Sequence, residues 1–286
     1  MRVFDRSICR LGNGIFRYLA SSLFMILYNA SRTYNENECT SFISEEFYRD
    51  WSNLILHSNL IAYINTNETY CFESFYQTDV YKLFRYDLNR WCREHPSDYI
   101  YSNDNGDITG YRIGDLLSEI NEDKKYDVVV HIRLEDFVSS GEKLIIHPES
   151  ICAVLEEIET SKICFLSNKI TSEFENKYMD YFKNKYQDKY NIIFESNDII
   201  TDFKIMNNAK IMICSLSTLC WMAGFLSKNI EKVYFPKNRF SKWHNQTFST
   251  IIPNTQVYDN ILCDEKELTE FLDIYTFKTV TDSGLE

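Results

Sequence analysis

A regular alternation of strand-like and helix-like segments between residues 127 and 236 constrains the fold more than any other feature. Short β-branched and apolar runs, typical of buried parallel strands, alternate with longer segments of helical character. This alternation predicts an α/β fold with a doubly wound parallel sheet. The predicted strands are 127–133, 162–167, 191–195, 210–214 and 232–236, and the predicted helices are 148–160, 171–185, 200–208 and 217–227.

The N-terminal part of the chain has a different pattern. Glycine is scarce, with 8 residues in 286, so the sequence Gly12-Asn13-Gly14 predicts a turn. A helical pattern follows it, residues 33–100 show no clear period, and a charged connector lies at 121–125. We therefore expect two lobes, 1–124 and 125–286, the second with a nucleotide-binding type of sheet. A helix at 266–277 would end the second lobe and could pack back on the first.

Composition narrows the possible partners. The chain has 42 acidic and 30 basic residues, a formal charge of −12, which argues against a nucleic-acid partner. An anionic ligand must then be held by a few well-placed cations and backbone N–H groups. The sequence has no apolar run of about 18 residues, so we expect no transmembrane segment. Nine cysteines without a C-x-x-C motif predict reduced thiols and a cytoplasmic protein. Five histidines without metal-ligand spacing predict no metal site.

Polar residues follow several of the predicted strands, at the edge where open parallel sheets bind ligands. His131 and Arg133 end one strand, Ser167 ends another, and Ser217 and Thr218 open a helix. An arginine can bind phosphate with two hydrogen bonds, and the N–H groups at a helix start also suit phosphate. From the residues alone, a surface salt bridge and ordinary helix capping explain these positions equally well.

Several familiar motifs are missing from the sequence. It has no G-x-x-x-x-G-K-[ST] phosphate loop and no G-x-G-x-x-G after a strand, which excludes kinase-type and dinucleotide-binding enzymes of those kinds. It also has no Asp-x-Asp, so a metal-dependent sugar-nucleotide site of that type lacks its ligands.

Motifs in order along the chain resemble those of α-1,2-fucosyltransferases. RLGNGIFRYLA (10–20) resembles the GGLGNQMFQYA segment of that family, and HIRLED (131–136) is similar to its H-x-R-R-x-D motif. FLSNK (165–169) stands where the family has FSDD. DFKIM (202–206), followed by AKIMICSLSTLCW, resembles D-x-x-LM…KHxIIxNSTFSWW. The chain departs from the family at Leu134, where a second arginine is expected, and at Asn168, where an acidic residue is expected.

The resemblance implies a GT-B-like glycosyltransferase with two Rossmann-like lobes and a donor-binding cleft between them. The implied reaction is metal-independent, inverting transfer of a sugar to a glycan hydroxyl, with the first lobe on the acceptor side. GDP-fucose is the expected donor, and no cofactor is needed beyond this co-substrate. Two alternatives stay open: another donor, such as a UDP-pentose or a different GDP-sugar, and a catalytically degenerate protein that only binds glycans or acts as a scaffold.

The resemblance also implies roles for particular residues of the second lobe. Arg133 would hold the donor pyrophosphate, with Ser217 and Thr218 contacting it from the helix start. Asp202 and Ser167 would hold the nucleoside. The remaining donor-binding candidate on this lobe is His131.

The first lobe and the carboxylates beside Arg133 complete the predicted site. Asn13, with Gly12, would face the diphosphate from the first lobe, and Arg10 could replace the missing second arginine. Asp136 and Glu135 are the candidates for a base that takes the acceptor proton. Either carboxylate could equally well serve only to orient the arginine.

Overall fold

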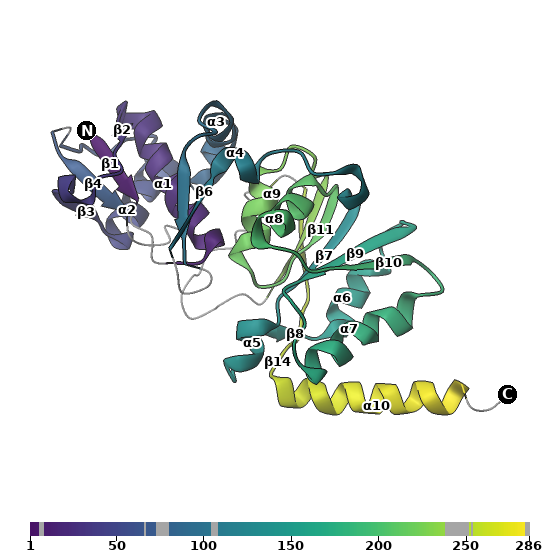
Figure 1. Cartoon of the computed structure of the whole chain (residues 1–286). Coiled ribbons are helices and arrows are strands. Elements are labelled where there is room, and N and C mark those ends of the chain that lie inside the picture. Colours follow the sequence, from purple (N-terminus) through teal and green to yellow (C-terminus); the bar gives the residue numbers. More distant parts are fainter. Residues whose placement is uncertain are drawn as a thin grey trace. The chain divides into compact units, whose positions relative to one another are not determined.

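The structure is a computed structural model that describes residues 1–5, 9–65, 67–72, 80–103, 108–237, 252 and 254–283, with side chains described as far as 275. Its contacts divide the chain into two units. The first contains Met1–Ser118 and Trp221–Leu226, and the second contains Glu119–Cys220 and the later strands and terminal helix. Each unit has a parallel sheet with accompanying helices, which confirms the α/β class (Figure 1). A donor cleft between two lobes stays a prediction.

The first unit is built on a four-stranded parallel sheet with strand order β2-β1-β4-β3. Phe24 of α1 lies at the centre of its aromatic core, against Trp51 and Phe72. The sequence left most of these elements unassigned. They are β1 (Arg2–Asp5), α1 (Leu11–Tyr28), β2 (Ser31–Arg32), β3 (Ser41–Ile43), α2 (Glu45–Ser58), β4 (Thr69–Phe72), α3 (Tyr81–Glu94), the antiparallel hairpin β5 (Tyr99–Ser102) and β6 (Thr109–Arg112), and α4 (Ile113–Leu116).

The predicted turn at Gly12-Asn13-Gly14 is wrong, because all three residues lie in the first turn of α1. Gly14 is required for close packing rather than for a turn. A Cβ atom at this position would lie 2.9 Å from the backbone oxygen of Tyr101 in β5. The glycine therefore allows the helix to approach the hairpin closely, which a sequence pattern does not distinguish from a turn.

The second unit contains a six-stranded parallel sheet with strand order β10-β9-β7-β11-β12-β13. Three predicted strands match the observed bounds, and the other two are somewhat shorter than predicted. The strands of this sheet are β7 (Val128–Ile132), β9 (Lys162–Ser167), β10 (Asn191–Glu195), β11 (Ile211–Ile213), β12 (Lys232–Pro236) and β13 (Thr255–Tyr258). The short strands β8 (Ile145–Ile146) and β14 (Leu262–Cys263) form a separate antiparallel pair.

The helices of the second unit also follow the predicted order. They are α5 (Glu135–Ser139), α6 (Pro148–Leu155), α7 (Glu173–Tyr186), α8 (Ile199–Asn208), the first part of α9 (Thr218–Leu226) and α10 (Glu265–Ser283). The last part of α9 belongs to the first unit, where Trp221 stacks on Phe16 with ring centroids 4.9 Å apart. α10 packs on α7, where Phe271 contacts the ring of Tyr181 (Figure 1). Whether this helix also packs back on the first lobe stays a prediction.

The cysteines differ from the prediction at two positions. Cys39 and Cys71 form a disulfide, with Cα atoms 5.9 Å apart. β3 begins two residues after Cys39 and lies beside β4, which contains Cys71, so the sheet brings the two cysteines near each other. The seven other cysteines are free and buried. Cysteine usage therefore no longer supports a cytoplasmic location. Within the described residues, no helix is both long and apolar enough to span a membrane.

Candidate functional site

The carboxyl ends of three neighbouring strands bring the predicted donor-binding residues of the second unit to one edge. β9, β7 and β11 are adjacent and parallel, and Ser167 at the end of β9 pairs with Ile132 at the end of β7. His131 connects β7 to the segment after β11, because its Nδ1 lies 2.7 Å from Oγ of Ser215. Arg133 and the segment 214–218 therefore follow adjacent strands at the same edge of the sheet.

Arg133 is held in a fixed orientation by Asp136. Its Nε donates to Oδ1 of Asp136 at 3.0 Å, and its Nη2 donates to Oδ2 at 2.7 Å. The guanidinium also lies over the ring of Phe137, 4.5 Å from the centroid. Because both oxygens of Asp136 accept from the arginine, this geometry favours the orienting role that the sequence left open. Glu135, the other candidate base, is exposed at the start of α5.

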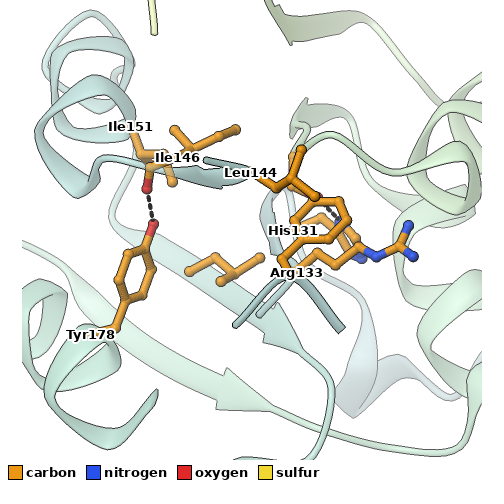
Figure 2. Close-up of a pocket in the computed structure, with 9 residues that line it drawn as sticks. His131, Arg133, Leu144, Ile146, Ile151 and Tyr178 are labelled. Carbon is orange, nitrogen blue, oxygen red and sulfur yellow. Dashed lines mark hydrogen bonds between the residues drawn. The ribbon is translucent and has the colours of Figure 1, made fainter. Parts of the chain in front are cut away.

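A small pocket lies behind Arg133 (Figure 2). Its volume, about 10 Å³, is room for roughly one water molecule. Figure 2 shows the guanidinium extending away from Ile151 and Tyr178 on the far wall. A diphosphate is too large for this pocket and would have to bind on the outer side of the arginine. The pocket is lined by His131, Ile132, Arg133, Phe137, Leu144, Ile146, Ile151, Tyr178 and Ser215.

The start of α9 combines capping with one partly exposed hydroxyl residue. Ser217 is buried, and its Oγ accepts a hydrogen bond from the backbone N–H of Leu219 at 3.2 Å. Thr218 begins the helix and is partly exposed. The first turn of α9 contains no acidic residue. No side-chain carboxylate of that turn therefore competes with an anionic ligand for the positive end of the helix dipole. Leu134, at the position of the missing arginine, is fully buried and adds no charge.

Asp202 and Ser167 differ in what they offer a ligand. Ser167 is buried, and its hydroxyl donates to the backbone oxygen of Asn168 at 3.0 Å. Asp202, in α8, accepts from the backbone N–H and the side-chain amide of Asn197, both at 3.1 Å. Burial raises the pKa of Asp202 to about 6, against the opposing effects of the Asn197 hydrogen bonds and the nearby His131. Asp202 is therefore mostly ionised at neutral pH.

The predicted residues of the first unit lie together at the N-terminus of α1. Arg10 is exposed and occupies the N-cap position, where its side chain makes no capping hydrogen bond. Gly12 is buried, and Asn13 is partly buried with no hydrogen-bond partner for its Oδ1. These residues and Arg133 belong to different units. Their joint action on one diphosphate stays a prediction.

Sequence reasoning missed a buried charge cluster in the first unit. Arg32, at the end of β2, forms ion pairs with Asp5 at the end of β1 and with Asp98, the latter at 3.6 Å. The guanidinium lies over the ring of Tyr18, whose hydroxyl donates to Asp98 at 3.1 Å. No sequence signal identifies this cluster, because its members are separated widely along the chain and meet only through the fold.

In the part of the chain that the structure describes, no three His, Cys, Asp or Glu side chains are grouped to hold a metal ion. No protein-family profile matches the chain, and no curated protein sequence matches it.

Solved structures resemble the chain in the arrangement of their backbones. A crystal structure of POFUT1 in complex with GDP has a TM-score of 0.44 and 10% sequence identity, covering 81% of this chain and 96% of that one. A second, of POFUT1 in complex with GDP-fucose, has a TM-score of 0.42 and 10% identity, covering 81% and 97%. At 10% identity and TM-scores below 0.5, this likeness says nothing about the function of this chain.

Proposed function

We propose that this protein is a glycosyltransferase that transfers a sugar, foremost fucose from GDP-fucose, to a hydroxyl group of a glycan. The observation that carries the proposal is the placement of Arg133. Asp136 fixes its guanidinium at the carboxyl edge of the second sheet, beside the segment that opens α9. In this proposal the second unit binds the donor and the first unit binds the acceptor.

The chemistry needs fixed positive groups at this edge. When the bond between the sugar and the donor phosphate breaks, negative charge develops on the departing diphosphate. A guanidinium already oriented by Asp136, with the N–H groups at the start of α9, can stabilise that charge without a divalent metal. The two hydrogen bonds to Asp136 reduce the reorganisation that Arg133 needs when the charge develops. With Asp136 engaged, Glu135 is the proposed base that takes the acceptor proton, and the transfer inverts the sugar centre.

The nucleoside contact is assigned to Asp202. Its ionised carboxylate can accept hydrogen bonds from the ring and exocyclic N–H groups of a guanine, which supports GDP over UDP as the carrier. Asn197 donates to Oδ1 of Asp202 only, so the other carboxylate oxygen has no hydrogen bond to the described residues. A UDP-pentose or another GDP-sugar is the alternative donor.

Replacement of Arg133 tests the proposal. Arg133→Ala should weaken GDP binding at least about tenfold, since it removes a charge-assisted, bidentate contact. Isothermal titration with GDP, GDP-fucose, UDP and a UDP-pentose measures this and identifies the nucleotide. Lys210→Ala is the matched control, because Lys210 is an exposed cation at the amino end of β11, paired with Asp127. Unchanged GDP affinity in Arg133→Ala, or no nucleotide binding by the native protein, contradicts the proposal.

A degenerate, glycan-binding protein is the second candidate, and the burial of Leu134 at the position of the second arginine favours it. Hydrolysis or transfer of GDP-fucose, monitored as release of GDP, separates the two. Nucleotide binding without any turnover in the presence of a glycan panel would support the second candidate, whereas turnover that Arg133→Ala abolishes would exclude it.

A further inference from the structure

A hydrogen-bonded network reaches Asp202 from the edge of the second sheet. Glu195 ends β10, the edge strand, and Asn197 follows it two residues later. Lys124 ends a short 3-10 helix, Glu122–Lys124, that precedes β7. The Nζ of Lys124 donates to Oε2 of Glu195 at 2.8 Å and to Oδ1 of Asn197 at 2.7 Å. The network thus joins three segments of the second unit that are separated along the chain.

The side-chain amide of Asn197 has one orientation that satisfies all its partners. Its oxygen accepts from Lys124, and its Nδ2 lies 3.0 Å from Oε2 of Glu195. The same Nδ2 lies 3.1 Å from Oδ1 of Asp202. An amide nitrogen has two donor hydrogens, and here each of them has a carboxylate. The opposite orientation would place the amide oxygen against two carboxylates and the NH₂ group against an ammonium, so the amide is fixed.

Glu195 has its own compensation within this network. Lys124 forms an ion pair with it, and the hydroxyl of Tyr126 donates to Oε1 of Glu195 at 2.7 Å. Burial opposes ionisation of this carboxyl, but the hydrogen bonds that it accepts lower its pKa below the ordinary value. Glu195 is therefore ionised at neutral pH and has Lys124 as its counter-charge. The Asn197 amide links this ion pair to Asp202.

Asp202 uses one of its two carboxylate oxygens in the network. Its Oδ1 accepts from the backbone N–H and from the side-chain amide of Asn197. Burial favours the neutral acid, and the Asn197 donors oppose it. The charged or titratable groups that interact electrostatically with Asp202 come from four elements: Asp198 of α8, His131 of β7, Cys164 of β9, and Lys124 before β7.

We infer that Lys124 and Asn197 are positioning residues that keep Asp202 ionised, with its Oδ2 left to accept hydrogen bonds from a ligand. An ionised carboxylate accepts from the two neighbouring N–H donors of a guanine, whereas a protonated one would place a proton against them. Identification of the ligand as the guanine of a nucleotide-sugar rests on the proposed function. The action of the two residues on Asp202 does not depend on it.

Titration of the protein with GDP-fucose from pH 5 to pH 8 tests this inference. Both phosphates of GDP-fucose are esterified, so their charge does not change in this range. The native affinity should fall as pH drops through about 6, where Asp202 takes up a proton. Lys124→Met and Asn197→Ala should each move this fall upward by about half a pH unit or more, because the carboxylate loses a cation or a donor. At pH 8 both variants should approach the native affinity.

Lys125→Met is the matched control. Lys125 is the next residue in the chain and pairs with Glu122, outside the network. Its removal should leave the pH profile in place. Histidines also titrate in this range, but every variant retains His131, so the comparison isolates Asp202. A profile that does not move in Lys124→Met or in Asn197→Ala overturns the inference, as does an equal movement in Lys125→Met. Loss of affinity by the same factor at every pH would indicate a purely structural role and would also overturn it.

A measurement without ligand separates this inference from the proposed function. The side-chain carboxyl carbon of Asp202, labelled with ¹³C and assigned by its absence in Asp202→Asn, reports protonation in NMR spectra. Its titration should move to higher pH in Lys124→Met and Asn197→Ala and stay in place in Lys125→Met. If the native protein binds no nucleotide, the proposed function fails, and this titration decides the roles of Lys124 and Asn197.

Discussion

Replacement of Asp202 by asparagine should stabilise the protein while impairing nucleotide binding. The carboxyl of Asp202 is largely buried in α8, and burial raises its pKa from 3.8 to about 6. One pKa unit corresponds to about 1.4 kcal/mol. Ionisation of this group in the folded protein therefore costs about 3 kcal/mol more than in the unfolded chain. The asparagine side chain can still accept both hydrogen bonds from Asn197 through its oxygen.

The effect has a definite pH dependence. Well below pH 3.8 the carboxyl is protonated in both states, and Asp202→Asn should change the free energy of unfolding little. Between pH 4 and pH 6 the unfolded chain has lost the proton but the folded protein retains it, so native stability falls as pH rises. Above pH 6 the full cost applies, and the variant should be more stable by roughly 2–3 kcal/mol.

Urea unfolding of the two proteins at pH 4.0 and pH 7.5, followed by circular dichroism, measures this difference. Titration with GDP at pH 7.5 should show weaker binding by the variant, because the amide no longer offers a negative charge to guanine. A variant that is less stable than the native protein at pH 7.5, or one equally stabilised at both pH values, would refute the reasoning.

Two further substitutions test local packing. Gly14→Ala should lower the free energy of unfolding by about 1–3 kcal/mol, because the new Cβ would be too close to the backbone oxygen of Tyr101. Urea unfolding measures this change. A gain in stability of about 1 kcal/mol, as for the same substitution in an ordinary helix, would contradict the prediction. Asp198→Ala should lower the free energy of unfolding by about 1–2 kcal/mol in the same assay, because Asp198 caps α8 by accepting hydrogen bonds from the N–H groups of Ile200 and Thr201. An unchanged free energy of unfolding would show that this cap does not stabilise the protein.

The second unit was largely predictable because its sequence signals are local. The run 128–132 is buried throughout and β-branched at all positions but His131, as suits a central parallel strand. Ser172 and Glu175 form a capping box that marks the start of α7 within a few residues. Polar residues after such strands have to meet at one sheet edge, so Arg133 and the start of α9 could be placed together from the sequence.

The first unit was not predictable in this way. Its strands have two to four residues, too short to show a period, and their pairing joins segments up to about 70 residues apart. The role of Gly14 depends on the approach of Tyr101, and the disulfide depends on β3 lying beside β4. None of these contacts leaves a local pattern.

The sequence by itself determined the parallel sheet of the second unit and the residues at its carboxyl edge. Both follow from residues close together in the chain: apolar runs predict the buried strands, and the polar residues directly after them mark the strand ends. Only the tertiary structure decided that Asp136 holds Arg133 and that Arg32 has two counter-charges. The electrostatic state of a charged side chain depends on burial and on partners brought close by folding, and distance along the chain does not determine either one.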